Sequence, residues 1–167
     1  MTVLEPLSFE CISHSDEQTQ RLGMRLGELL PPRAVVALSG PLGAGKTQFA
    51  RGVGAGWGSA QPLRSPTFTL VQEHHRPTDD RTLYHIDLYR VERERDLMSL
   101  GLDEVFEDED GVAIVEWAER AVNLIAADAL WVKFAIASES KRLLTFSTQA
   151  DSAWQVLLLF RKRVFGV

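Results

Sequence analysis

The sequence predicts an α/β fold, in which helices cover both faces of a mostly parallel central sheet and the last two strands form an antiparallel hairpin. Three observations support this prediction: a glycine-rich segment at residues 40–47, a strand pattern before it with a helix pattern after it, and an apolar run that ends in a carboxylate at residues 112–117. With 167 residues, the chain has the length of a single domain, and we assign residues 1–167 to it.

The first two expected elements are a strand and an amphipathic helix. Residues 7–12 can form the strand. Ser15 is a good N-cap for the helix, and Gln18 stands at the capping-box position. Four leucines then recur at i, i+4, i+7 and i+8, which is the spacing of one helix face, and Pro31 with Pro32 ends the helix.

Residues 40–47 match G-x-x-x-x-G-K-[ST], the phosphate-binding loop, at every specified position. Glycines in such a loop allow backbone N–H groups to approach a polyphosphate closely. Lys46 can then reach the β- and γ-phosphates, and the Thr47 hydroxyl can ligate Mg²⁺. We therefore expect nucleotide contacts from the loop and the first helical residues, namely Gly40, Leu42, Gly43, Ala44, Gly45, Lys46, Thr47 and Gln48.

The segments on either side of the loop agree with this assignment. Residues 34–38 form a short apolar run typical of a buried strand. Helical spacing follows the loop, and Gly54 and Gly56 indicate its end, so residues 54–62 are expected to form a loop. An ordinary glycine-rich turn is the alternative, but it does not explain the order strand, loop, helix. The fold is therefore expected to be of the phosphate-loop NTPase type.

Two polar patterns further along each have two interpretations. Residues 65–71 are either a switch-like segment that contains Thr67 or the plain start of a strand after a proline turn. Residues 83–89 alternate, which places His85 and Asp87 on one strand face. Asp87 is either part of a solvent-facing strand or an acid aimed at Mg²⁺ or at the attacking water.

The last third of the chain predicts a helix, a buried strand and a hairpin. Residues 91–106 have the mixed charges of a solvated helix. Four apolar residues precede Glu116, and a carboxylate at the end of a buried strand costs free energy unless it is paired or bound to a metal. Glu116 is therefore a predicted Mg²⁺ ligand. Residues 128–137 and 142–148 are expected to pair as the hairpin, followed by a terminal helix.

Composition limits the kinds of function. The net charge of −5 and the sequence pI near 5.4 disfavour direct binding of nucleic acid, so contact with RNA is expected through a partner. The single cysteine, Cys11, cannot form an internal disulfide. We find no signal-peptide pattern and no apolar run of the roughly 20 residues that span a bilayer, so we expect a cytoplasmic protein without membrane contact.

Four motifs occur in a fixed order: the phosphate loop at 40–47, S-P-T-F-T-L at 65–70, H-I-D-L-Y-R at 85–90 and V-E-W at 115–117. Many families share the phosphate loop, whereas the combination of the other three is specific. Together they resemble one family, the bacterial ATPase of tRNA threonylcarbamoyladenosine (t6A) biosynthesis, TsaE or YjeE. The resemblance extends from about residue 15 to residue 148.

The resemblance implies a cytoplasmic ATPase that binds the TsaB–TsaD pair and supports threonylcarbamoylation of adenosine 37 in ANN-decoding tRNAs. TsaD is the transferase of that system, and ATP hydrolysis by the TsaE-like subunit sustains repeated cycles. The matching positions imply that Lys46 contacts the phosphates and that Thr47 and Glu116 serve Mg²⁺. Asp87 would orient water or bind the metal, and Thr67 would lie in a switch-like segment.

The family pattern also places the adenine of the nucleotide. It would lie near the start of the first helix, at Glu17, and near the last hairpin, at Lys141. The chain departs from the family at two places. Pro41 stands where the family usually has an acidic residue, and Ser-Lys-Arg at 140–142 replaces Gly-Arg-Arg.

Three functions are compatible with the motifs. An accessory ATPase is favoured, with slow hydrolysis alone because no segment offers an obvious arginine finger. ATP is favoured over GTP because the only asparagine, Asn123, does not form the N-K-x-D motif of guanine recognition. A small-molecule kinase would transfer the phosphate to an acceptor. A nucleotide-gated binding module would use the bound state as its signal, with incidental hydrolysis.

Overall fold

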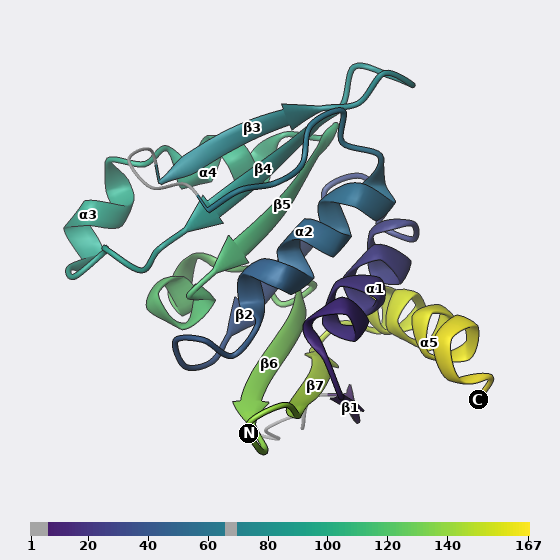
Figure 1. The fold of residues 1–167 in the computed structure, drawn as a ribbon. Helices are drawn as coiled ribbons and strands as arrows, with labels where there is room; N and C mark the ends of the chain where they lie inside the picture. The colour runs from purple at the N-terminus through teal and green to yellow at the C-terminus, as the bar shows by residue number, and fades with distance from the viewer. Residues whose placement is uncertain (1–6, 66–69) are drawn as a thin grey trace, which may run out of the picture.

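The computed structural model describes residues 7–65 and 70–167, and Figure 1 shows them built around one seven-stranded sheet. The strands lie in the order β1-β7-β6-β2-β5-β4-β3. Their bounds are β1 (Leu7–Ser13), β2 (Val35–Ser39), β3 (Val71–His75), β4 (Thr82–Asp87), β5 (Gly111–Glu116), β6 (Leu130–Ile136) and β7 (Arg142–Thr148).

The middle of the sheet is parallel and both edges are antiparallel. Strands β6, β2, β5 and β4 run in one direction, as expected for strands joined by helical crossovers. β7 pairs antiparallel with β6, which confirms the predicted hairpin, and β1 and β3 add one antiparallel strand at each edge. The predicted α/β fold is thus confirmed, with the parallel pairing confined to the centre.

Helices cover both faces of the sheet and divide the core into two parts. In Figure 1, α1 (Asp16–Gly27), α2 (Lys46–Trp57) and α5 (Asp151–Phe165) lie together on one side. The other face carries three short elements: α3 (Glu94–Met98), α4 (Leu102–Glu107) and the 3₁₀ helix η1 (Ala118–Leu124). Fully buried residues on both sides of the sheet make this a three-layer arrangement.

Helix α2 is longer than the sequence predicts. Gly54 and Gly56 were expected to end it, but the helix continues to Trp57 and ends at Gly58, which adopts a left-handed conformation with φ of 100°. The reason is tertiary packing: a Cβ atom on Gly56 would lie 2.0 Å from a backbone oxygen of α1. Gly56 therefore allows the two helix backbones to touch, a benefit that outweighs its low helix propensity.

The predicted helix over residues 91–106 is also corrected. The structure divides this segment into α3 and α4, because Gly101 between them has a φ of 67°. The break turns α4 back so that Leu102 and Leu97 both enter the core beneath β4 and β5.

Strand register brings the predicted site residues to one edge of the sheet. Leu38 at the end of β2 is opposite Glu116 of β5, and Glu116 is opposite Asp87 of β4. The carboxyl ends of these three parallel strands therefore meet where the phosphate loop leaves β2, which is where ligands bind in open α/β sheets.

Candidate functional site

The phosphate loop connects β2 to α2, and at Gly40 and Gly45 its backbone adopts conformations that favour glycine. Gly40 has a φ of 136°, and a Cβ atom there would lie 2.5 Å from the backbone oxygen of Phe134. Gly45, at the N-cap of α2, has a φ of 100°. The loop therefore curls tightly over the end of the sheet and ends at the N-terminus of a 12-residue helix, which carries partial positive charge.

Lys46 lies buried at the base of this loop, with a relative exposure of 5%. Its Nζ donates to the carbonyl oxygens of Gly40 and Pro41, at 2.6 and 2.8 Å, and lies 4.1 Å from the centroid of the Trp117 ring. Burial lowers the pKa of Lys46, while Glu119, Glu116 and Asp87 oppose this shift through their negative charges. The lysine is thus placed at the loop by contacts with both backbone and aromatic groups.

A chain of hydrogen bonds links α2 to the strands beneath it. The Thr47 hydroxyl donates to Glu116 Oε1 at 2.7 Å, and Glu116 Oε2 lies 2.6 Å from His85 Nε2. Glu116 is 2% exposed and His85 is fully buried. The paired carboxylate therefore connects the first turn of the helix to β5 and β4, and the costly burial of its charge is offset by two partners.

Asp87 ends β4 beside this chain. Its Oδ1 accepts from the backbone N–H of Tyr89 at 2.9 Å, which closes a short turn. Burial raises the pKa of the Asp87 carboxyl, and the charge of Glu116 acts in the same direction. The hydrogen bond from the Tyr89 backbone N–H and the electrostatic effects of His85 and Lys46 lower this pKa.

These side chains surround a cleft of about 430 Å³. The cleft includes most of the residues predicted from the phosphate loop and both predicted acids. The predicted residues that line it are Leu42, Gly43, Ala44, Gly45, Lys46, Thr47, Gln48, Asp87 and Glu116. Gly40 contributes through the carbonyl that accepts from Lys46. The pattern of strand, loop and helix thus forms a concave surface that brings together the predicted cation Lys46, the Thr47 hydroxyl and the carboxylates of Asp87 and Glu116.

Of the predicted residues that the structure describes, Glu17 and Lys141, besides Gly40, are not among those lining the cleft. Glu17 is exposed on α1, and the neighbouring Asp16 lines the cleft instead. Lys141 is exposed in the turn of the hairpin, and Arg142 Nη2 is the group that reaches the loop, 3.4 Å from the Gly43 oxygen. Thr67 lies outside the described residues.

Two aromatic residues of the cleft were not among the predicted site residues. Tyr89 and Trp117 both line the cleft, and the centroids of their rings lie 5.2 Å apart. Both belong to predicted motifs: Tyr89 stands two residues after Asp87, in the turn that follows β4, and Trp117 directly follows Glu116. Trp117 has a left-handed backbone with φ of 59°, an unusual conformation for a bulky residue, and such strain often occurs at functional sites.

The oxygen groups of the cleft fit Mg²⁺. Mg²⁺ in nucleotide sites takes one or two carboxylates together with phosphate oxygens and water, and Thr47, Glu116 and Asp87 offer one hydroxyl and two carboxylates. Within residues 7–65 and 70–167, no group of three His, Cys, Asp or Glu side chains is arranged as a metal site of its own. The same described residues contain no helix that is both long and apolar enough to cross a membrane.

Comparison with known families shows which family this chain belongs to. The family model described as "Threonylcarbamoyl adenosine biosynthesis protein TsaE" matches residues 13–144, which include the phosphate loop, β4 and β5. The chain belongs to the TsaE family. TsaE proteins are involved in tRNA threonylcarbamoyladenosine biosynthesis, and their phosphate-loop fold implies nucleotide binding.

Individual TsaE proteins agree with this membership. The chain is 35% identical to that of Treponema pallidum over 135 residues, which cover 81% of this chain and 97% of the relative. It is 36% identical to that of Bacillus subtilis over 131 residues, which cover 78% and 80%. A crystal structure of Bacillus subtilis YdiB matches with a TM-score of 0.78 at 26% identity, covering 96% of this chain and 99% of the other.

Proposed function

We propose that this TsaE-family chain is an accessory ATPase that binds ATP with Mg²⁺ and releases ADP and phosphate. In this proposal it acts in the cytoplasm, as one domain, with the TsaB–TsaD pair that threonylcarbamoylates adenosine 37 of ANN-decoding tRNAs. It contacts tRNA only through that pair. The observation that carries the proposal is the hydrogen bond between Thr47 and Glu116, which joins the phosphate-loop hydroxyl to the strand-end carboxylate.

In this proposal, the phosphate loop and Lys46 bind the triphosphate. The backbone N–H groups at the start of α2 and the ammonium group supply positive charge to the phosphates. Gln48 and Asp16 also line the cleft, and Arg142 contacts the loop from the hairpin. Glu17 and Lys141 remain proposed adenine-side contacts in their exposed positions at the same end of the sheet.

In this proposal, the side chains of Thr47, Glu116 and Asp87 carry out hydrolysis. Thr47 and Glu116 would hold Mg²⁺, which when bound supplies positive charge to the phosphate oxygens. Asp87 would either complete the metal site or orient the attacking water, and both roles require its carboxylate at the end of β4. Thr67, outside the described residues, is proposed to act in a switch-like segment.

The residues of the cleft lead us to expect slow ATP hydrolysis by the chain alone. Among the described residues that line it, Lys46 is the only cation and none is an arginine. An arginine that stabilises the transition state typically accelerates phosphoryl transfer by about 10³- to 10⁵-fold. We therefore expect the partner pair to raise the rate.

The test is phosphate release from ATP with Mg²⁺, measured on the chain alone and with the TsaB–TsaD pair. We expect slow release that rises with the pair and is lost in Lys46→Ala. If the pair neither binds nor changes the rate, the accessory role is wrong. Phosphate transferred to a small-molecule acceptor would indicate a kinase, and full tRNA modification by an ATP-binding but inactive Glu116→Ala would indicate a nucleotide-gated binding module.

A further inference from the structure

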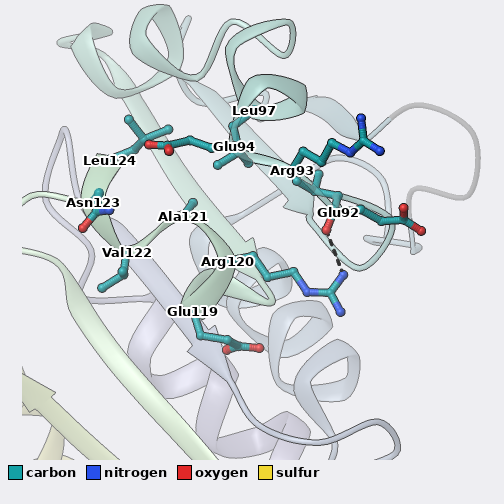
Figure 2. Close-up of a pocket in the computed structure, with 11 residues that line it drawn as sticks. Glu92, Arg93, Glu94, Leu97, Glu119, Arg120, Ala121, Val122, Asn123 and Leu124 are labelled. Carbon is teal, nitrogen blue, oxygen red and sulfur yellow. Dashed lines mark hydrogen bonds between the residues drawn. The ribbon is translucent and has the colours of Figure 1, made fainter.

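One arginine outside the predicted site holds the turn that follows β4. Arg120 Nη1, from η1, donates to the carbonyl oxygens of Leu88 and Val91, each at 3.2 Å, and to that of Tyr89 between them. Figure 2 shows the side chain extending from η1 toward this turn, with the bond to Val91 drawn as a dashed line. A single guanidinium therefore binds three acceptors within four consecutive residues.

The same turn directly follows Asp87, one of the proposed hydrolytic groups, and binds its carboxylate. Its first residue, Leu88, donates from its backbone N–H to the backbone carbonyl oxygen of Glu116 at 3.1 Å. The backbone N–H of Tyr89 donates to the Asp87 carboxylate. The backbone that Arg120 binds is thus the backbone that fixes Asp87 relative to Glu116. A shift of this turn would move the carboxylate away from its position opposite the end of β5.

Arg120 also contacts the aromatic wall of the cleft. Its guanidinium carbon lies 5.0 Å from the centroid of the Trp117 ring and 5.6 Å from that of Tyr89. Trp117 in turn lies against the ammonium group of Lys46. Contacts between cations and aromatic rings at these distances are attractive. The arginine therefore connects β4, β5 and the phosphate loop through two kinds of contact.

We propose that Arg120 is a positioning residue for ATP hydrolysis, which holds the Asp87 turn and the Trp117 ring in the arrangement that the reaction needs. This inference rests on the proposed ATPase function. Arginine suits the role because its planar group offers several donors in fixed directions and stacks on aromatic faces, whereas a lysine ammonium does neither in the same way.

The surroundings of Arg120 make the inference testable by chemical rescue. Arg120 lies on the wall of a groove of about 550 Å³ between η1 and the segment Val91–Leu97. Removal of its side chain would leave the three carbonyl oxygens facing a space that a small cation can enter. Guanidinium ions in solution can then occupy the position of the missing side chain, whereas ammonium ions lack its planar donors.

The experiment compares Arg120→Ala and Arg120→Lys with Arg93→Ala, which removes an exposed arginine from the same groove. We expect both Arg120 variants to lower kcat by about 10- to 100-fold, because small displacements of reacting groups have effects of this size. KM should change little, since the phosphate loop is intact. Guanidinium, at concentrations too low to unfold the protein, should restore part of the kcat of Arg120→Ala, and ammonium should not.

Amide hydrogen exchange supplies a readout that is independent of activity. We expect faster exchange at the N–H groups of Leu88, Tyr89 and Val91 in Arg120→Ala than in Arg93→Ala, with unchanged exchange in the central strands. Equal kcat in these two variants would overturn the proposal. So would a loss of kcat without faster exchange in the turn, or without rescue by guanidinium.

The two proposals fail in different ways. If the wild-type chain, alone and with TsaB–TsaD, releases phosphate no faster than Lys46→Ala, the ATPase function is wrong, and the role of Arg120 in hydrolysis is wrong with it. If wild type is active and Lys46→Ala is not, the ATPase function holds, and the Arg120 variants decide the positioning role on their own.

Discussion

His85 Nε2 lies 2.6 Å from Glu116 Oε2, and neither side chain has contact with solvent beyond the 2% exposure of the glutamate. Glu116 Oε1 accepts from the Thr47 hydroxyl. His85 therefore fixes the opposite oxygen of the carboxylate that we propose as a metal ligand. Among the described residues, His85 Nδ1 is buried without a hydrogen-bond partner, so within this part of the chain the contact with Glu116 is the polar contact that holds the ring. Groups that orient a metal ligand from behind commonly tune its function.

We predict that His85→Phe lowers ATP hydrolysis by about 10- to 100-fold, the usual effect of losing a partner of a metal ligand. It should also lower the free energy of unfolding by about 1–3 kcal/mol, because Glu116 keeps a buried oxygen without its partner. Phosphate release and denaturant unfolding measure the two effects. His75→Phe, at an exposed position of β3, is the control. Wild-type hydrolysis in His85→Phe would contradict the orienting role.

Glu116→Gln separates binding from hydrolysis. The amide can still contact Thr47 but carries no charge, so we expect ATP to bind while hydrolysis falls by about 100-fold or more, as for the loss of a main transition-state contact. Lys46→Ala should instead weaken ATP binding itself, since it removes the cation of the cleft. Equilibrium binding of a labelled ATP analogue, measured beside phosphate release, distinguishes the two. If Glu116→Gln and Lys46→Ala weaken binding equally, the proposed division of roles is wrong.

The sequence predicted the parts of the cleft that depend on local pattern and parallel topology. A glycine-rich loop between a strand and a helix, with Lys46 and Thr47 at fixed spacing, specifies its own geometry. Asp87 and Glu116 end parallel strands, and such ends meet at one edge of a sheet. Their proximity therefore follows from topology, although nothing in their local sequence shows that β4 and β5 are neighbours.

The remaining features depend on tertiary contacts that local patterns do not encode. Arg120 belongs to a mixed-charge segment after Trp117, and its three carbonyl acceptors come from a turn about 30 residues earlier in the chain. Their meeting depends on the left-handed backbone of Trp117, which redirects the chain after β5. In α2, the prediction that Gly54 and Gly56 end the helix failed because Gly56 faces the backbone of α1 and Gly54 faces the Leu63 side chain.

That helix contact predicts an unusual response to alanine. A Cβ atom on Gly52 would lie 2.0 Å from the Gln20 oxygen, in the middle of both helices. Gly52→Ala should therefore lower the free energy of unfolding by about 1–3 kcal/mol through overpacking, although alanine favours an isolated helix by about 1 kcal/mol. Ala55→Gly, on the exposed face of α2, is the control for propensity alone. A higher denaturation midpoint in Gly52→Ala would show that the helices can separate at little cost.

The Tyr84–Asp108 pair predicts a dependence of stability on alkaline pH. The Tyr84 hydroxyl donates to Asp108 Oδ2 at 2.6 Å, and this bond, with burial, raises the pKa of Tyr84 to about 12. Because the folded state favours the protonated phenol, the bond stabilises the fold fully below the unfolded pKa of about 10. This contribution is lost as the pH rises toward 12.

Tyr84→Phe removes the hydroxyl and with it this dependence. We expect wild type to be more stable than Tyr84→Phe at neutral pH, and the difference to shrink as the pH rises from about 10 to about 12. Urea unfolding of both proteins at a series of pH values measures the difference, and losses common to both cancel. A difference that stays constant over this range would mean that the Tyr84 phenol ionises equally easily in the folded and unfolded chains. The hydrogen bond to Asp108 would then not stabilise the protonated phenol.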